Sequence, residues 1–130
     1  MSQTSSILIV DDSAMMRAMI KRAILVSGVE IGTTYEASNG QEALALLGSQ
    51  TIDAVFTDIN MPVMTGTELL RRLAADPRWN GLTRVVISTD GSAARREEVA
   101  GLDVRRYLVK PFTPEVMRDV LTEVAGPARA

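Results

Sequence analysis

Residues 7–13 read ILIVDDS, in which four apolar residues are followed directly by Asp11, Asp12 and Ser13. A short apolar run bounded by turn residues is typical of a strand buried on both faces, as in a parallel sheet. Three further runs end in a polar residue in the same way: residues 52–57 (IDAVFT) before Asp58, residues 84–87 (RVVI) before Ser88, and residues 106–109 (RYLV) before Lys110. Residues 33–38 form a weaker fifth candidate, closed by turn residues at 39 and 40.

Segments with apolar residues at helical spacing lie between these runs. The expected helices cover residues 14–26, 41–47, 67–75, 92–102 and 114–125. In the first of them we expect Met15, Met16 and Met19 to serve in core packing and in adaptable packing against a partner, and Gly28 to end the helix. In the last, Thr113 is the expected N-cap. Strands that alternate with helices predict an α/β fold with a parallel sheet and right-handed crossovers.

The fourth expected helix, residues 92–102, has little to bury beyond alanines, Val99 and Leu102, and glycines stand at 91 and 101. A helix that buries little apolar surface is weakly held by its neighbours. We therefore predict that it is the least protected helix in native-state hydrogen exchange.

The composition predicts one globular domain over residues 1–130, with its core at about residues 7–125. The chain is 46% hydrophobic and 23% charged, close to the globular average. A net charge of −2 argues against nucleic acid or anionic membrane as a partner, and no segment reads as a targeting sequence. Cys and His are absent, which excludes disulfides, thiolate nucleophiles and histidine catalysis. Chemistry must use carboxylates, hydroxyls and lysine, which favours hard-metal and phosphoryl chemistry.

Polar residues at the strand ends form the candidate site. The carboxyl ends of parallel strands meet at one edge of the sheet, where ligands bind in this class of fold. Asp11, Asp12 and Asp58 would repel one another there unless a cation neutralised them, and oxygen ligands are those that Mg²⁺ prefers. Lys110 adds a positive charge and Ser88 a hydroxyl. Together these groups predict a site that holds a phosphoryl group during in-line transfer.

An ordinary structural interpretation stands beside this one. Asp11 and Asp12 could simply cap the first helix, since Asp is favoured at helix N-termini. Their combination with Asp58 and Lys110 at matching strand ends favours the functional interpretation.

Three other features are expected to be structural only. The arginine pairs at 71–72 and 95–96 are expected to be solvated helix faces without a functional role. Trp79, in the loop before the strand at residues 84–87, is expected to be a partly buried side chain.

Four segments in order resemble the signature segments of response-regulator receiver domains: ILIVDDS at 7–13, FTDINMP at 56–62 with Gly66 following, VVIST at 85–89 and YLVKPF at 107–112. The resemblance extends over residues 7 to about 125 and is greatest to the stand-alone chemotaxis regulators of the family. It implies a flavodoxin-like, doubly wound (βα)5 fold with strand order 2-1-3-4-5.

The resemblance also implies a phosphorylated nucleophile and a metal site. Asp58 would accept the phosphoryl group as an aspartyl phosphate. Asp12 would bind Mg²⁺ or Mn²⁺ directly and Asp11 mostly through water, joined by Asp58 and the backbone carbonyl of Asn60. Lys110, with a cis bond to the proline that follows it, would contact the phosphoryl oxygens.

Further residues would transmit or end the signal. Ser88 would bind the phosphoryl group, and Tyr107 would rotate inward after it, altering the face formed by the fourth helix, fifth strand and fifth helix. Asn60 and Asp90 would tune dephosphorylation and indicate a fairly labile phosphate. Asp103 replaces a common glycine after the fourth helix, and we expect the turn to survive because Asp tolerates the left-handed conformation.

The implied function is a cytoplasmic phosphorelay switch rather than a turnover enzyme. A histidine kinase would donate the phosphoryl group, and the signal would leave through contact with an unidentified protein. We expect a monomer that can dimerise on phosphorylation, with neither nucleic acid nor membrane as partner.

Two other function classes remain open. A metal-dependent phosphohydrolase with its nucleophile after the first strand would need a second acid two residues on, where this chain has Ser13. A degenerate receiver that serves only as a scaffold would not need the intact set of site residues. Dinucleotide and P-loop sites are disfavoured because no glycine-rich loop follows the first strand.

Overall fold

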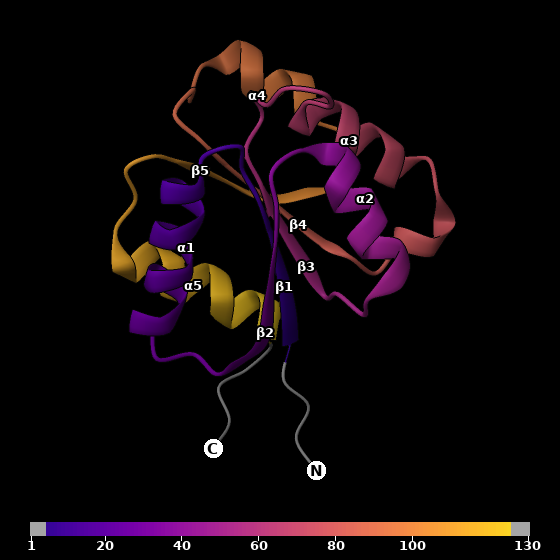
Figure 1. The fold of residues 1–130 in the computed structure, drawn as a ribbon. Coiled ribbons are helices and arrows are strands. Elements are labelled where there is room, and N and C mark those ends of the chain that lie inside the picture. Colours follow the sequence, from indigo (N-terminus) through magenta and orange to yellow (C-terminus); the bar gives the residue numbers. More distant parts are fainter. Residues whose placement is uncertain (1–4, 126–130) are drawn as a thin grey trace.

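The computed structural model describes residues 5–125 and contains one five-stranded parallel sheet flanked by helices (Figure 1). The strands are β1 (Ser5–Val10), β2 (Ile31–Ala37), β3 (Ala54–Thr57), β4 (Thr83–Ser88) and β5 (Val104–Val109). The helices are α1 (Ala14–Val26), α2 (Gly40–Ser49), α3 (Gly66–Ala74), α4 (Ala93–Val99) and α5 (Pro114–Ala125), with a short 3₁₀ helix η1 (Pro77–Trp79). The strand order β2-β1-β3-β4-β5 confirms the flavodoxin-like arrangement.

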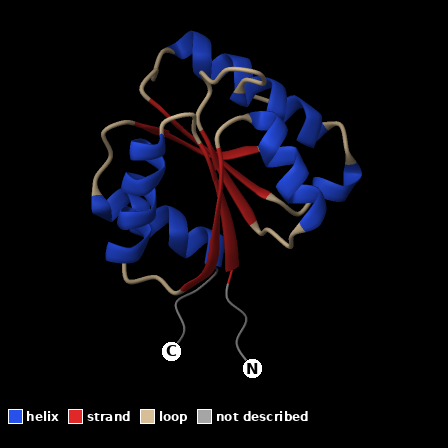
Figure 2. Ribbon diagram, viewed as in Figure 1, coloured by secondary structure: helices blue, strands red, loops and turns tan. Residues whose placement is uncertain are grey.

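Helices cover both faces of the sheet (Figure 2). In Figure 1, α1 and α5 lie on one side and α2, α3 and α4 on the other. Alternate residues of β1 serve the two layers: Ile7 and Ile9 pack with α1 and α5, whereas Leu8 and Val10 pack with α2 and α3. Because both faces are buried, the strand shows an unbroken apolar run instead of an alternating one.

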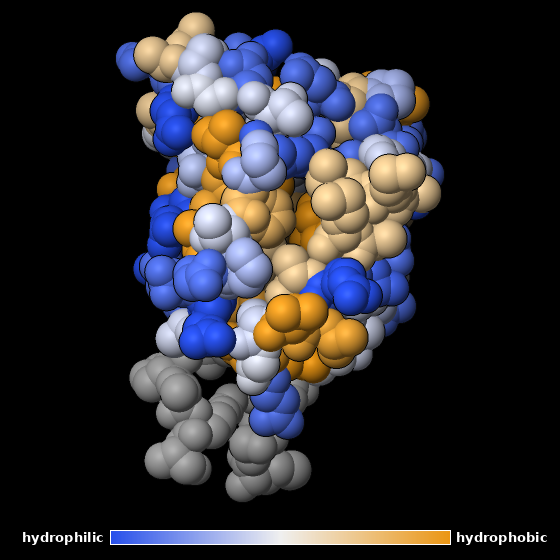
Figure 3. All heavy atoms as spheres, turned by 90° about the vertical axis from the view of Figure 1, so that its left-hand side faces the viewer, coloured by the Kyte–Doolittle hydropathy of each residue, from blue (hydrophilic) through white to orange (hydrophobic). Residues whose placement is uncertain are grey.

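The methionines of α1 divide between the core, where Met16 packs, and the surface. Met15 is 75% and Met19 56% exposed, while Ile20 and Ile24 are the buried residues of α1. Leu25 of the same helix is also exposed, and Figure 3 shows apolar surface on the side of the molecule that carries α1 and α5. Helical periodicity therefore places the apolar stripe of α1 correctly at Met16, Ile20 and Ala23, and Met15 and Met19 lie at its exposed edge.

Side-chain hydroxyls cap the N-termini of α1 and α5, and the cap of α1 distinguishes between the two interpretations of Asp11 and Asp12. The side chain of Ser13 accepts a hydrogen bond from the Met16 backbone N–H at 3.1 Å and is the N-cap. The capping interpretation of Asp11 and Asp12 is therefore wrong, which leaves their carboxylates available to the site. Thr113 accepts from the Val116 N–H at 3.2 Å, as predicted.

The loop from α4 to β5 uses the predicted left-handed turn. Asp103 has a φ of 60°, so Asp adopts the conformation that glycine commonly supplies. Its carboxylate pairs at 2.9 Å with the guanidinium of Arg84, which is buried although the strand around it is apolar. The same guanidinium donates to the carbonyls of Leu73 and Trp79, so Arg84 joins β4 to α3 and η1. Trp79 is half-buried, as expected.

None of the helices between residues 5 and 125 combines the length and apolar character that a membrane crossing requires.

Candidate functional site

Three carboxylates converge at the carboxyl edge of the sheet, as the sequence predicts. Asp11 and Asp12 follow β1, Asp58 follows β3, and these two strands are hydrogen-bonded neighbours. One carboxylate oxygen from each residue lies within 4.8 Å of the others. Asp11 is buried, Asp58 half-buried and Asp12 exposed. An oxygen-only donor set of this kind suits a hard divalent cation, and its open side leaves room for water ligands.

Backbone hydrogen bonds fix the two inner carboxylates. The Asp58 N–H donates to the Val10 carbonyl at 2.9 Å, and one Asp58 carboxylate oxygen, Oδ1, accepts from the Ile59 N–H at 2.6 Å. The Asp11 Oδ1 accepts from the Ser13 N–H at 2.9 Å. The second carboxylate oxygen of each residue is thereby left to face the centre of the site.

Lys110 occupies that centre from the end of β5. Its ammonium lies 3.0 Å from the Asp11 Oδ2 and 3.2 Å from the Asp58 Oδ2, and its side chain is largely buried. Three carboxylates and one ammonium leave a formal charge of −2, which a single divalent cation balances. The donor set and the charge therefore both fit a magnesium site. The bond from Lys110 to Pro111 is cis.

Gly66 determines the path of the chain that leaves Asp58. A Cβ added at Gly66 would lie 1.9 Å from the backbone carbonyl oxygen of Asp58, far inside contact distance. The Gly66 N–H donates to the Ile59 carbonyl at 2.8 Å, and Thr65 caps α3 beside it. Glycine is required here by the close approach of two backbone segments, and the position of Asp58 depends on it.

Residues 7–122 match the family model described as response regulator receiver domain. The chain belongs to this family. The chemotaxis protein CheY of Pseudomonas aeruginosa is 38% identical over 118 residues, 91% of this chain and 94% of that protein. A CheY homolog of Campylobacter jejuni is 35% identical over 121 residues, 92% of each chain. The structure of CheY4 of Vibrio cholerae superposes with a TM-score of 0.78 at 31% identity, covering 94% of this chain and 99% of that one.

Two further predicted residues of the receiver domain meet at the backbone of Asp90. Ser88 is buried at the end of β4, where its hydroxyl accepts from the Asp90 N–H at 3.1 Å and its carbonyl from the Lys110 N–H at 2.8 Å. The Tyr107 hydroxyl donates to the Asp90 carbonyl. Burial raises the pKa of the Tyr107 hydroxyl, so it stays a protonated donor at neutral pH. The loop after β4 therefore connects the site to β5.

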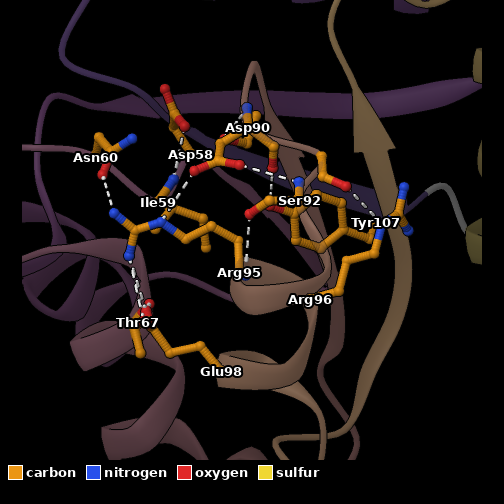
Figure 4. Close-up of polar contacts among 12 residues, drawn as sticks. Asp58, Ile59, Asn60, Thr67, Asp90, Ser92, Arg95, Arg96, Glu98 and Tyr107 are labelled. Atoms are coloured by element: carbon orange, nitrogen blue, oxygen red, sulfur yellow. Dashed lines mark hydrogen bonds and ion pairs between the residues drawn. The ribbon is translucent and has the colours of Figure 1, made fainter.

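The prediction that the arginine pair at 95–96 is merely solvated is wrong for Arg95, whereas Arg96 is exposed, as predicted (Figure 4). The Arg95 guanidinium contacts Asp90, Asn60 and Glu98 at 3.2–3.3 Å, and the Arg96 guanidinium lies 4.8 Å from the centre of the Tyr107 ring. Hydrogen bonds from Ser92 and then the Arg95 guanidinium lower the pKa of the Asp90 carboxyl, which keeps it ionised.

The other pair, Arg71 and Arg72, is exposed on α3, as predicted. No sequence pattern identifies these contacts of Arg95, because its partners Asn60 and Asp90 come from two separate loops. The binding of metal by the Asn60 backbone carbonyl stays a prediction.

Proposed function

We propose that this receiver domain of a two-component system is a cytoplasmic switch, phosphorylated on Asp58 by a histidine kinase in the presence of Mg²⁺ or Mn²⁺. The arrangement of Asp11, Asp12 and Asp58 around the Lys110 ammonium is the observation that carries the proposal. We propose further that residues 1–130 belong to one domain.

In the proposed reaction an Asp58 carboxylate oxygen attacks the phosphorus of a phosphohistidine. The bond between that phosphorus and the histidine nitrogen breaks, and the electron pair returns to the imidazole. Asp11, Asp12, Asp58 and the Asn60 carbonyl would hold the metal, which supplies positive charge to the phosphoryl oxygens. Lys110 would exchange its contact with Asp58 for one with a phosphoryl oxygen. No separate substrate is turned over.

The signal is proposed to leave through Ser88 and Tyr107. The phosphoryl group carries a charge of about −2 and brings new acceptor oxygens, which attract the Ser88 hydroxyl. Before phosphorylation the Ser88 hydroxyl accepts from the Asp90 N–H, and the Asp90 carbonyl accepts from the Tyr107 hydroxyl. A shift of the serine toward the phosphoryl group would therefore free the tyrosine to turn inward. The face of α4, β5 and α5 then changes, and a protein partner reads it there. Dimerisation of the phosphorylated form is compatible with this output.

The test is incubation of the protein with Mg²⁺ and acetyl phosphate, followed by intact-mass measurement. We expect one added phosphoryl group on the wild type and none on Asp58→Asn, with loss of labelling when EDTA removes the metal. Asp119→Asn, a matched change on the exposed surface of α5, should be labelled like the wild type. An unmodified wild type, or equal labelling of Asp58→Asn, would contradict the proposal.

The loops that carry Asn60 and Asp90 are proposed to set a short phosphoryl lifetime. Both residues have polar side chains on the loops that leave the paired strands β3 and β4. A phosphoryl group that persists for many hours on the wild type would contradict this part of the proposal.

A further inference from the structure

One guanidinium binds the side chains of both loops that leave the site. The Arg95 Nε donates to the Asp90 Oδ2 at 3.2 Å, and an Arg95 terminal nitrogen donates to the Asn60 Oδ1 at 3.3 Å. Figure 4 shows Arg95 between Asn60 and Asp90. These loops follow β3 and β4, which pair side by side, so Arg95 bridges them next to Asp58.

The bridge occupies the acceptor atoms of both side chains. The Asp90 carboxylate accepts from the Ser92 N–H at 3.0 Å through its Oδ1 and from Arg95 through its Oδ2. The Asn60 side-chain carbonyl, the acceptor of that amide, is likewise engaged by Arg95. A water molecule that attacks a phosphoryl group is best oriented by an acceptor for its hydrogen. While Arg95 is in place, each carboxylate or carbonyl oxygen of these two side chains already accepts a hydrogen bond from the protein. That donor competes with a water molecule for the same oxygen.

The guanidinium itself is held by the helix that carries the output face. Another Arg95 nitrogen contacts the Glu98 carboxylate at 3.2 Å, and Glu98 accepts from the Thr67 hydroxyl of α3 at 2.7 Å. In α4 Val99 is the buried residue, so polar contacts contribute much of what fixes this helix. A movement of α4 would therefore release Asn60 and Asp90 together.

We propose that Arg95 is a positioning residue that competes with the hydrolytic water for Asn60 and Asp90, so that the phosphoryl group on Asp58 lives longer than these two side chains alone would allow. The inference rests on the proposed function. In that hydrolysis the water oxygen bonds to phosphorus as the bond from phosphorus to the Asp58 oxygen breaks. The carboxylate is restored, and both water protons leave with inorganic phosphate.

The experiment labels each variant with acetyl phosphate and Mg²⁺, removes the donor, and follows the loss of the phosphoryl group. Arg95→Ala should shorten the half-life roughly three- to tenfold, the range that one ordinary hydrogen bond contributes to a rate. Arg95→Lys should lie between Ala and wild type, because it keeps one charged donor. Arg72→Ala removes an exposed arginine that pairs with Glu68 on α3, and it should leave the half-life unchanged.

A double-mutant cycle separates positioning from general loosening of the structure. In a background with Asn60→Ala and Asp90→Ala, adding Arg95→Ala should have no further effect on the half-life. An equal shortening in that background would overturn the inference, as would a half-life that is unchanged or longer in Arg95→Ala alone. If Arg95→Ala does not fold, Arg95→Lys and its combination with the background give the same comparison. Absence of labelling in the wild type would instead refute the proposed function.

Discussion

Val63 has a φ of 70° in the loop between β3 and α3, a left-handed conformation that β-branched side chains avoid. Backbone contacts hold the loop directly after this residue. The Met64 carbonyl accepts from the Gly40 N–H at 3.2 Å, and Gly66 packs against the Asp58 carbonyl. Backbone strain is thus located five residues from the proposed phosphoacceptor.

Val63→Gly should stabilise the protein. Glycine adopts the left-handed conformation without the steric cost of a Cβ, which is about 1–2 kcal/mol. Against this gain stands about 0.5–1 kcal/mol from the greater backbone entropy of glycine in the unfolded chain. Little packing is lost, because Val63 is 76% exposed. We expect a net gain of roughly 0.5–1 kcal/mol in the free energy of unfolding, measured by urea denaturation.

The control is Val63→Ala, which keeps a Cβ in the left-handed conformation and should recover less than half of the gain. A glycine variant less stable than the wild type would show that Val63 is not strained in the folded protein.

At single residues, the sequence predicts those whose place follows from the sheet and misses those placed by distant contacts. Asp11, Asp12, Asp58 and Lys110 lie together because parallel strands end at one edge. Arg95 could not be found in this way, because its partner Asn60 lies 35 positions earlier, in another loop. Spacing along one helix does not report such a contact.

Among the helices of the described chain, α4 buries the fewest side chains. It has seven residues, of which Val99 is buried, whereas Met117, Val120 and Leu121 of α5 are fully enclosed. The few apolar residues in the sequence predict this limited burial. The predicted helix at 92–102, however, is longer than the observed one. The helix ends at Val99 because Ala100 is extended and Gly101 has a φ of 93°.

Other element boundaries show the same limit. The strand predicted at 52–57 begins at Ala54, and the candidate at 33–38 is displaced to Ile31–Ala37. Apolar runs locate strands well, but their first residues depend on hydrogen bonds to neighbours, such as the Asp53 N–H to the Ser6 carbonyl at 2.9 Å. The order of the strands came from the family resemblance, since local patterns do not specify which strands pair.

Hydrogen exchange should distinguish α4 from the other helices. Each large apolar side chain that is buried adds about 1.5–3 kcal/mol to the free energy of local opening, so amides of α4 should be protected at least about tenfold less than those of α5. Native-state exchange followed by NMR or mass spectrometry gives both values in one sample. The α3 helix, with Leu69, Leu70 and Leu73 buried, is the internal comparison. Protection in α4 equal to that in α5 would contradict the prediction.

For the whole molecule, charge is unevenly placed although the net value is only −2. Three carboxylates share one edge of the sheet, and a single lysine offsets them. Mutual repulsion of like charges at that edge opposes folding, and a bound cation removes it. The stability of the whole fold is therefore coupled to the occupancy of the site.

Magnesium should raise the stability of the folded protein through this coupling. A ligand that binds only the native state adds about 2.7 kcal/mol to the free energy of unfolding when its concentration is 100 times its dissociation constant. The unfolding midpoint should therefore rise with Mg²⁺ and return to its metal-free value when EDTA is added. Asp12→Asn removes an exposed charge of the cluster. It should be slightly more stable than the wild type without metal, by less than about 1 kcal/mol because solvent screens the charge, and should gain much less from Mg²⁺. Asp119→Asn changes the same charge on the surface of α5, so its response to Mg²⁺ should match the wild type. If both variants respond alike, the cation acts on the surface as a whole, and the three carboxylates do not form the binding site.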